Sequence, residues 1–244
     1  MPFINYSVLV KKIETVTMSD TSGTSPDQIK LTPEIILKAY SLGMFPMAKN
    51  RYDNELFWVD PEYRGIIPLD NLHISRSLRK QLRNNTFTIR YSTDFNGVIM
   101  GCAGQSDDRH DTWINSKIIA LYSQLFEQGF VQTVECWQDD LLVGGLYGIC
   151  LKGAFFGESM FSHKSNASKI ALIHLVARLN EDEFTLLDTQ FITDHLISLG
   201  GIKITRNDYL NRLEKALLVN AKFNNNGSEL SHQIHIKKLL HNQL

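Results

Sequence analysis

The chain has 244 residues, of which 43% are hydrophobic and 21% are charged, and its formal net charge is −1. This length and composition are typical of a globular protein with a sizeable core, and they argue against an intrinsically disordered chain. The 25 basic and 26 acidic residues nearly balance, which excludes a uniformly basic nucleic-acid coat. Any contact with RNA must therefore use a local basic patch.

Cysteine usage and hydropathy indicate the compartment. Cys102, Cys136 and Cys150 form no CxxC pair and no Cys/His spacing of the kind that binds zinc, and their odd number argues against a secreted disulfide framework. No apolar run approaches the roughly 18 residues of a membrane span. The first ten residues lack the basic region of a signal peptide. We therefore expect a cytoplasmic protein without a membrane segment or a Cys/His zinc site.

The N-terminal part divides into two segments. Residues 1–29 are rich in polar and turn-forming residues around 19–26, which predicts a flexible extension. A small N-terminal domain is expected over residues 30–70. It opens with a helix at Thr32-Pro33, where a hydroxyl can cap the helix and proline suits the first turn, and Gly43 ends it. The aromatic, proline-containing stretch that follows and includes Met47 suits either a small satellite core or the wall of a binding site.

Residues 71–220 are predicted to form the larger domain. Hydrophobic periodicity predicts helices over 75–84, 116–128, 166–179, 194–199 and 208–218, and strands over 87–91, 133–137, 141–151, 154–158 and 184–190. An antiparallel meander followed by a helix and another strand is typical of an α+β fold. We expect an acetyltransferase-like (GNAT-like) mixed sheet with flanking helices. Residues 221–244 are polar and are predicted to be a tail.

Two short motifs in this domain carry candidate chemistry. Asp188 and Gln190 are two residues apart on a predicted strand, so both side chains point to one face. A carboxylate buried there needs a partner or a cleft, and the pair suits either a reaction site or a hydrogen bond that organises the sheet. The run 157–162 ends another strand, where Glu158 can bind an ammonium group and Met160 can wall an apolar pocket. Taken singly, these residues also fit ordinary core packing.

A basic helix face is the third candidate feature. Arg76, Arg79, Lys80 and Arg83 recur at helical spacing, and no acidic residue occurs between Asp70 and Asp94. A solvated basic face is the common explanation, but the missing acidic partners favour a polyanion such as RNA. Trp113 fits either a structural tryptophan or a platform for an unpaired base.

Eight motifs between Leu31 and Leu218, in order, resemble the leucyl/phenylalanyl-tRNA–protein transferase family. Any one of them is weak, but eight in sequence are specific. They are Ala39-Tyr40-Ser41-Leu42-Gly43-Met44-Phe45-Pro46, Leu72-His73-Ile74-Ser75-Arg76-Ser77-Leu78, Asp111-Thr112-Trp113-Ile114, Val134-Glu135-Cys136-Trp137, Leu142-Val143-Gly144-Gly145-Leu146-Tyr147-Gly148, the run 156–162, Asn166-Ala167-Ser168-Lys169 and Leu187-Asp188-Thr189-Gln190.

The resemblance implies an activity. Such enzymes move leucine, and also phenylalanine or methionine, from aminoacyl-tRNA to the N-terminal amine of proteins that start with Arg or Lys. The added residue marks the protein for N-end rule degradation. The family needs no metal or added cofactor, and we expect a monomer that binds aminoacyl-tRNA and protein substrates.

The resemblance also implies roles for individual residues. Gln190 would guide the attacking amine, Asp188 would polarise Gln190, and Glu158 would hold the ammonium of the aminoacyl group. Trp113 would pack on the terminal adenosine, and the basic helix would meet the acceptor stem. The residues implied to line the side-chain pocket are Met160, Phe155, Leu146, Leu175 and Met47.

One departure from the family pattern leaves alternatives open. Many relatives carry a tryptophan after Phe45-Pro46, whereas this chain has Met47. A different aminoacyl group such as arginine, or acidic acceptor N-termini, is therefore the alternative. A coenzyme-A-dependent N-acetyltransferase is less favoured, because the segment before the helix at Asn166 lacks the glycine-rich pyrophosphate loop of that class. A non-catalytic RNA-binding protein would leave Glu158, Asp188 and Gln190 without a shared purpose.

Overall fold

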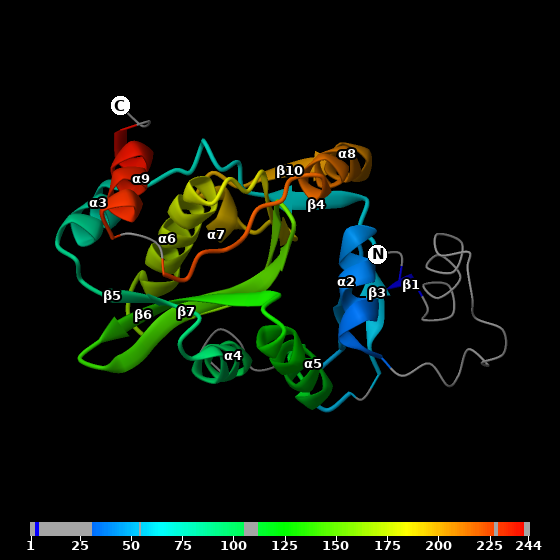
Figure 1. Ribbon diagram of the computed structural model, residues 1–244. Coiled ribbons are helices and arrows are strands. Elements are labelled where there is room, and N and C mark those ends of the chain that lie inside the picture. Colours follow the sequence, from blue (N-terminus) through cyan, green and yellow to red (C-terminus); the bar gives the residue numbers. More distant parts are fainter. Residues whose placement is uncertain (1–2, 5–30, 54, 105–111, 227–228, 242–244) are drawn as a thin grey trace, which may run out of the picture.

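The computed structural model describes residues 3–4, 31–53, 55–104, 112–226 and 229–241. Within these ranges the largest element is a mixed seven-stranded sheet in the order β10-β4-β9-β8-β7-β6-β5 (Figure 1). Its strands are β4 (Tyr63–Ile66), β5 (Thr88–Tyr91), β6 (Val131–Gln138), β7 (Leu141–Leu151), β8 (Ala154–Ser162), β9 (Leu186–Gln190) and β10 (Ile202–Thr205). The predicted α+β fold with a mixed sheet and flanking helices is confirmed.

The centre of this sheet is the predicted antiparallel meander. β6 pairs with β7 and β7 with β8, both antiparallel. The first turn uses Asp139 and Asp140 at φ of 51° and 59°, the left-handed geometry that suits a two-residue hairpin. The second turn contains Lys152 at φ of 56°. β8 continues to Ser162, four residues beyond its predicted end, so that Glu158 lies within the strand.

β8 and β9 then diverge. They pair in parallel only from Ala154 to Phe156 and from Leu186 to Asp188. β9 also pairs with β4, through Ile66 opposite Asp188 and Gly65 opposite Gln190. The middle of the sheet therefore opens next to Glu158, at the end of β9.

Helices cover both faces of the sheet (Figure 1). The helices on one face share a core with α6 (Ala167–Glu181), and those on the other share a core with α2 (Pro33–Ser41) and α5 (Ser116–Glu127). The helices are α2 (Pro33–Ser41), α3 (Arg76–Arg83), α4 (Phe95–Ala103), α5 (Ser116–Glu127), α6 (Ala167–Glu181), α7 (Asp194–Ile197), α8 (Arg206–Leu217) and α9 (Glu229–His241). None of the helices in these described ranges is long and apolar enough to cross a membrane.

The N-terminal unit contains α2 and a small sheet of β1 (Phe3–Ile4), β3 (Phe57–Val59) and β2 (Phe45–Met47). The extension expected over residues 1–29 lies outside the described residues, except for β1, which pairs antiparallel with β3. β4 falls within the expected unit of residues 30–70 but belongs to the large sheet. The pattern missed β4 because Arg64 interrupts its short apolar run.

The C-terminal segment differs from the expected tail. Residues 229–241 form α9, which packs against α6. Ile236, Leu239 and Leu240 are spaced i, i+3 and i+4, and all three pack on the core beneath α6. Phe223 precedes the helix and contacts the ring of Phe155 at 6.1 Å between centroids. The helix has five apolar residues in its sequence, and because they do not share one helical stripe they give no clear periodic signal.

We predict that Leu239→Ala lowers the free energy of unfolding by roughly 2–5 kcal/mol, because it removes a buried side chain that is only 5% exposed. Urea denaturation measures the change. Leu218→Ala serves as a matched control, since Leu218 is 84% exposed and its loss should change stability by about 0.5 kcal/mol or less. Equal midpoints for the two variants would mean that α9 does not pack on α6 in solution.

Candidate active site

A cavity of about 230 Å³ lies where β8 and β9 diverge. Its wall is mainly apolar, and its polar side chains include Glu158, Thr189 and His195. The full lining consists of Leu146, Tyr147, Gly157, Glu158, Ser159, Met160, Leu172, Leu175, Leu187, Thr189, Thr193, His195 and Leu196. An apolar cavity with a few convergent polar groups is a typical small-ligand site.

Glu158 is held by three donors at this cavity. The Tyr40 hydroxyl donates to Oε1 at 2.6 Å, and the Tyr122 hydroxyl donates to Oε2 at 3.0 Å. The Gln190 amide Nε2 donates to Oε1 at 3.1 Å. Burial raises the pKa of Glu158 to about 7, although the three hydrogen bonds act to lower it. The group therefore changes charge near neutral pH, which is unusual for a carboxyl and typical of functional sites.

Asp188 is fully buried and forms an ion pair with Arg64. Arg64 Nε lies 2.9 Å from Oδ1, and Nη2 lies 2.7 Å from Oδ2, with side-chain exposures of 1% and 0% for the two residues. The Tyr209 hydroxyl donates to Oδ2 at 2.7 Å. Arg64 also donates to the carbonyl of Gly43 at 2.9 Å. Asp188 is absent from the cavity lining given above, so it reaches the cavity only through its neighbours.

Gln190 connects the buried ion pair to Glu158. Its backbone N–H donates to Asp188 Oδ1 at 2.7 Å, and its side chain donates to Glu158. Its φ of 61° lies in the left-handed region, which costs a non-glycine residue on the order of 1–3 kcal/mol. The sequence pattern predicted two side chains on one strand face. The link instead runs through the backbone of Gln190, which Asp188 holds in an unfavourable conformation.

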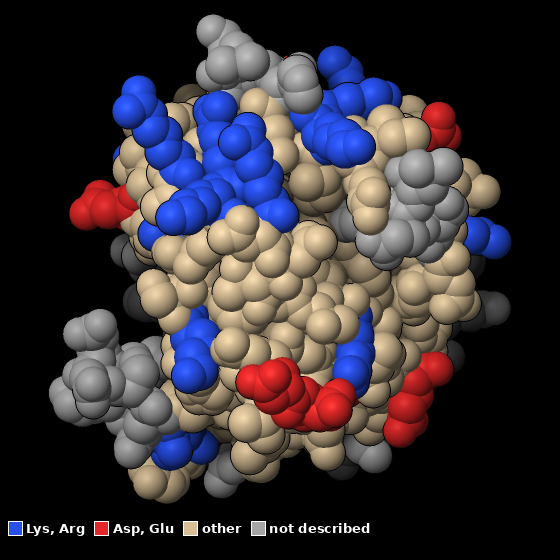
Figure 2. All heavy atoms as spheres, turned by 90° about the vertical axis from the view of Figure 1, so that its left-hand side faces the viewer, with Lys and Arg blue, Asp and Glu red and all other residues tan. Residues whose placement is uncertain are grey.

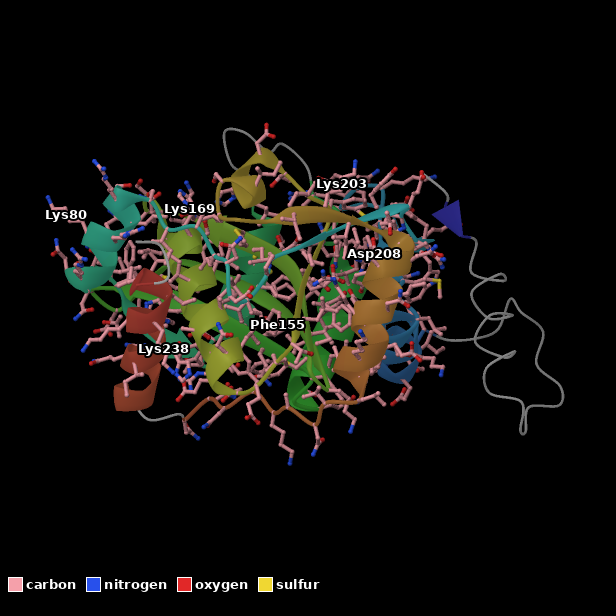
Figure 3. All side chains as sticks on the ribbon, turned by 90° about the horizontal axis from the view of Figure 1, so that it is seen from above. Lys80, Phe155, Lys169, Lys203, Asp208 and Lys238 are labelled. Carbon is pink, nitrogen blue, oxygen red and sulfur yellow. The ribbon has the colours of Figure 1, made fainter. Side chains whose placement is uncertain are left out.

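The structure brings three of the five expected pocket residues together. Leu146, Met160 and Leu175 line the cavity beside Glu158. Phe155 is 0% exposed and lies in the core, in the middle of the view from above (Figure 3). Met47 lies on β2 and packs against the core on the other face of the sheet. Neither Phe155 nor Met47 is part of the cavity lining.

The expected RNA-binding residues lie in two separate places, on α3 and in the loop before α5. Arg76, Lys80 and Arg83 are exposed on α3, whereas Arg79 is half-buried and donates its Nε to the carbonyl of Ile74 at 3.0 Å. Figure 2 shows Lys and Arg atoms concentrated in the upper half of the face that includes α3. Trp113 is half-buried just before α5 and packs against the core on the opposite face of the sheet.

Sequence reasoning missed most of the residues that hold the site. A signal for Arg64 existed, because a charged residue inside a short apolar run requires a partner when buried. Tyr40 and Tyr122 fitted ordinary helical stripes and gave no signal. His195 lines the cavity, and its buried Nε2 has no hydrogen-bond partner among the described residues. Among the residues that the structure describes, no group of three or more His, Cys, Asp or Glu side chains could hold a metal ion.

We predict that Arg64→Met lowers the free energy of unfolding by roughly 3–5 kcal/mol, because it leaves the buried Asp188 carboxylate without its cation. The double variant Arg64→Met/Asp188→Asn should lose less than the sum of the two single variants. Urea denaturation of all four proteins measures this coupling. Additive losses would show that the two side chains do not interact in solution.

Comparison with known proteins identifies the family. A family model described as leucyl/phenylalanyl-tRNA protein transferase matches residues 66–214, and a model of the N-terminal domain of the same family matches residues 30–62. A leucyl/phenylalanyl-tRNA–protein transferase of Paramagnetospirillum magneticum is 52% identical over 198 residues, which cover 81% of this chain and 95% of the relative. One of Rhodospirillum rubrum is 53% identical over 195 residues, which cover 80% of this chain and 92% of the relative. The resemblance seen in the motifs is thus confirmed, and the chain belongs to the leucyl/phenylalanyl-tRNA protein transferase family of acyltransferases.

Proposed function

We propose that the chain transfers leucine, and also phenylalanine or methionine, from aminoacyl-tRNA to the N-terminal amine of proteins that start with Arg or Lys. The added residue marks these proteins for N-end rule degradation. The observation that carries the proposal is the contact between Glu158 and Gln190 beside an apolar cavity. The family and the names of its relatives agree with transfer of an aminoacyl group from tRNA to protein.

The cavity supports an apolar aminoacyl group. The side chain of leucine, phenylalanine or methionine would contact Leu146, Met160 and Leu175. Ionised Glu158 would bind the α-ammonium group of the same residue. An arginine side chain would place a second cation in a cavity whose lining contains no acidic residue besides Glu158. This arrangement favours the apolar substrates over the arginine alternative.

Gln190 is proposed to position the attacking amine. The acceptor amine has a reference pKa of about 8, so part of it is neutral at cellular pH. It attacks the ester carbonyl, a C–N bond forms, and the bond from the carbonyl to the ribose oxygen breaks. The nitrogen loses a proton and the leaving ribose oxygen gains one. The side-chain carbonyl of Gln190 can accept a hydrogen bond from the amine, and Asp188 keeps Gln190 in place.

The segment before α6 argues against coenzyme A as the donor. A pyrophosphate cradle at a helix start needs free backbone N–H groups. Here the N–H groups of His163 and Lys164 both donate to the carbonyl of Val143. The N–H of Ala167 donates to the carbonyl of Lys164, and that of Ser168 donates to the Ser162 hydroxyl. These donors are already used within the protein.

Two surfaces are proposed to bind the tRNA. Trp113 would pack on the terminal adenosine, and the basic residues of α3 would contact the acceptor stem through its phosphates. Met47 lies on β2, outside the cavity lining, so any influence that it has on the preference among aminoacyl groups would act through residues between β2 and the cavity.

The test of this proposal is a transfer assay. Transfer RNA charged with labelled leucine, phenylalanine, methionine or arginine is mixed with peptides that begin with Arg, Lys, Asp or Glu. We expect transfer of the three apolar residues to Arg and Lys peptides. We further expect Asp188→Asn to lower kcat about 10²-fold or more, the scale of a lost positioning or acid–base group, with little change in the Kd for tRNA. No transfer in any combination would disprove the function, and equal losses of kcat and tRNA affinity would make Asp188 purely structural.

The pKa of Glu158 predicts a pH dependence. Because only the ionised carboxyl attracts an ammonium group, kcat/KM for wild type should rise as pH increases through about 7. Glu158→Gln should lower kcat/KM above pH 7 and remove the rise of kcat/KM near pH 7. The rise near the acceptor pKa of about 8 should remain in both proteins. A variant that keeps the wild-type profile would show that Glu158 does not act through its charge.

A further inference from the structure

A second and larger cavity lies between α3, β5, α6 and the segment that leads to α9. Its volume is about 510 Å³. We call it the α3–α9 groove, and its lining is Gln81, Leu82, Asn85, Thr86, Phe87, Thr88, Ile89, Arg90, Tyr91, Thr93, Ile170, His174, Arg178, Asn225 and Asn226. The aminoacyl-transfer site described above shares none of these residues.

The lining of the groove is suited to a polar, anionic ligand. About half of its side chains are amides or hydroxyls, and no Asp or Glu is among them. Arg178 is its deepest polar residue, with 2% exposure. Its guanidinium lies 4.8 Å from the ring of Tyr91 and donates to Glu181 at 2.7 Å, while its buried Nε has no acceptor among the described residues.

Basic residues flank the groove on two sides. α3 contributes Arg76, Lys80 and Arg83 on one side, and Lys237 and Lys238 are exposed on α9. Lys80 and Lys238 lie at the same end of the molecule (Figure 3). In the upper half of Figure 2, basic atoms gather on the left and on the right, with uncharged surface between them. A polyanion that follows this surface would be attracted on both sides of a hydrogen-bonding groove whose lining contains no acidic side chain.

α6 separates this groove from the transfer site. Ile170, His174 and Arg178 recur every four residues and line the groove, whereas Leu172 and Leu175 line the aminoacyl cavity. The two sets occupy different stripes of one helix. A ligand in the groove therefore contacts the enzyme away from the reacting ester.

We propose that the α3–α9 groove binds a sugar–phosphate stretch of the tRNA away from its aminoacyl end, and that Asn225 and Asn226, which lie before α9, form part of the wall of this site. Amide and hydroxyl groups are frequent partners of phosphate and ribose oxygens. The match to the family model ends at residue 214, so this part of the wall lies beyond the part of the chain that the model matches. The identity of the ligand rests on the proposed function, because that function makes tRNA the substrate.

Two pairs of variants test the groove with uncharged tRNA. Asn225→Asp keeps the side-chain shape but adds a negative charge in the groove, and Asn211→Asp adds the same charge on exposed α8. Lys237→Glu/Lys238→Glu is matched by Arg212→Glu/Lys215→Glu, which makes the same change in net charge on α8. Binding is measured between 50 and 300 mM salt, chosen as roughly the range in which phosphate contacts dominate affinity. Melting temperatures confirm that all four variants fold.

We expect Asn225→Asp to raise the Kd for tRNA about fivefold or more near 0.1 M salt. The α9 double variant should lower the slope of log Kd against log salt by about 2, since each lost phosphate contact changes it by about 0.9. The two control variants should change the Kd less than twofold. Transfer from saturating aminoacyl-tRNA should keep its wild-type kcat in all four.

The outcomes separate this inference from the proposed function. If the groove variants have the same Kd for tRNA and the same salt dependence as their controls, the proposal that the groove binds tRNA is wrong. Variants that raise the KM for the acceptor peptide while leaving tRNA binding intact would assign the groove to the protein substrate instead and overturn the RNA assignment. A wild-type protein that transfers no aminoacyl group, but whose tRNA affinity falls in the groove variants, would support the groove and reject the proposed function.

Discussion

The buried ion pair between Arg64 and Asp188 is the constraint on which the site depends. It joins β4 to β9, and through Tyr209 and the carbonyl of Gly43 it also holds α8 and the end of α2. Replacing a buried ion pair by apolar residues is often neutral or stabilising, so its value need not be net stability. The geometry of the ion pair does explain the position of Gln190, because the Asp188 carboxylate also accepts a hydrogen bond from the backbone N–H of Gln190. The orientation of Gln190 toward Glu158 follows from that bond.

The opening of the sheet places Glu158 where a ligand can reach it. The register of β7 and β8 shifts at Tyr147/Gly148, close to the residue at which β8 leaves β9. Gly148 is required there, since a Cβ at this position would lie 2.3 Å from the Phe155 ring and from the carbonyl of Phe156. The hydroxyls of Tyr40 on α2 and Tyr122 on α5 donate hydrogen bonds to the Glu158 carboxyl from outside the sheet. A carboxyl surrounded in this way is buried enough to raise its pKa and still borders the cavity.

Local pattern predicted the elements better than the partners. The meander and α6 carry strong periodicity, and β7 has the predicted bounds. Glu158, Asp188 and Gln190 stood out because polar groups on apolar strands need an explanation. Their partners are not local: Arg64 lies 124 residues from Asp188, and Tyr40 lies 118 residues from Glu158. No single-strand or single-helix pattern carries that pairing. The same limit explains α9, whose three apolar contacts matter only because α6 offers a matching surface.

The two proposed binding sites lie on different stripes of α6, and this separation limits which aminoacyl groups the cavity can distinguish. In the proposed reaction, contacts to the body of the tRNA are the same for every aminoacyl group, so discrimination must come from the cavity near Leu146, Met160 and Leu175. A difference of one methylene in an apolar pocket is worth only about 1–3 kcal/mol, which separates leucine, methionine and phenylalanine weakly. A charged side chain instead loses its hydration without gaining a partner, which costs far more. In the proposed reaction, an apolar cavity with a single carboxyl would therefore accept several apolar residues and reject polar ones.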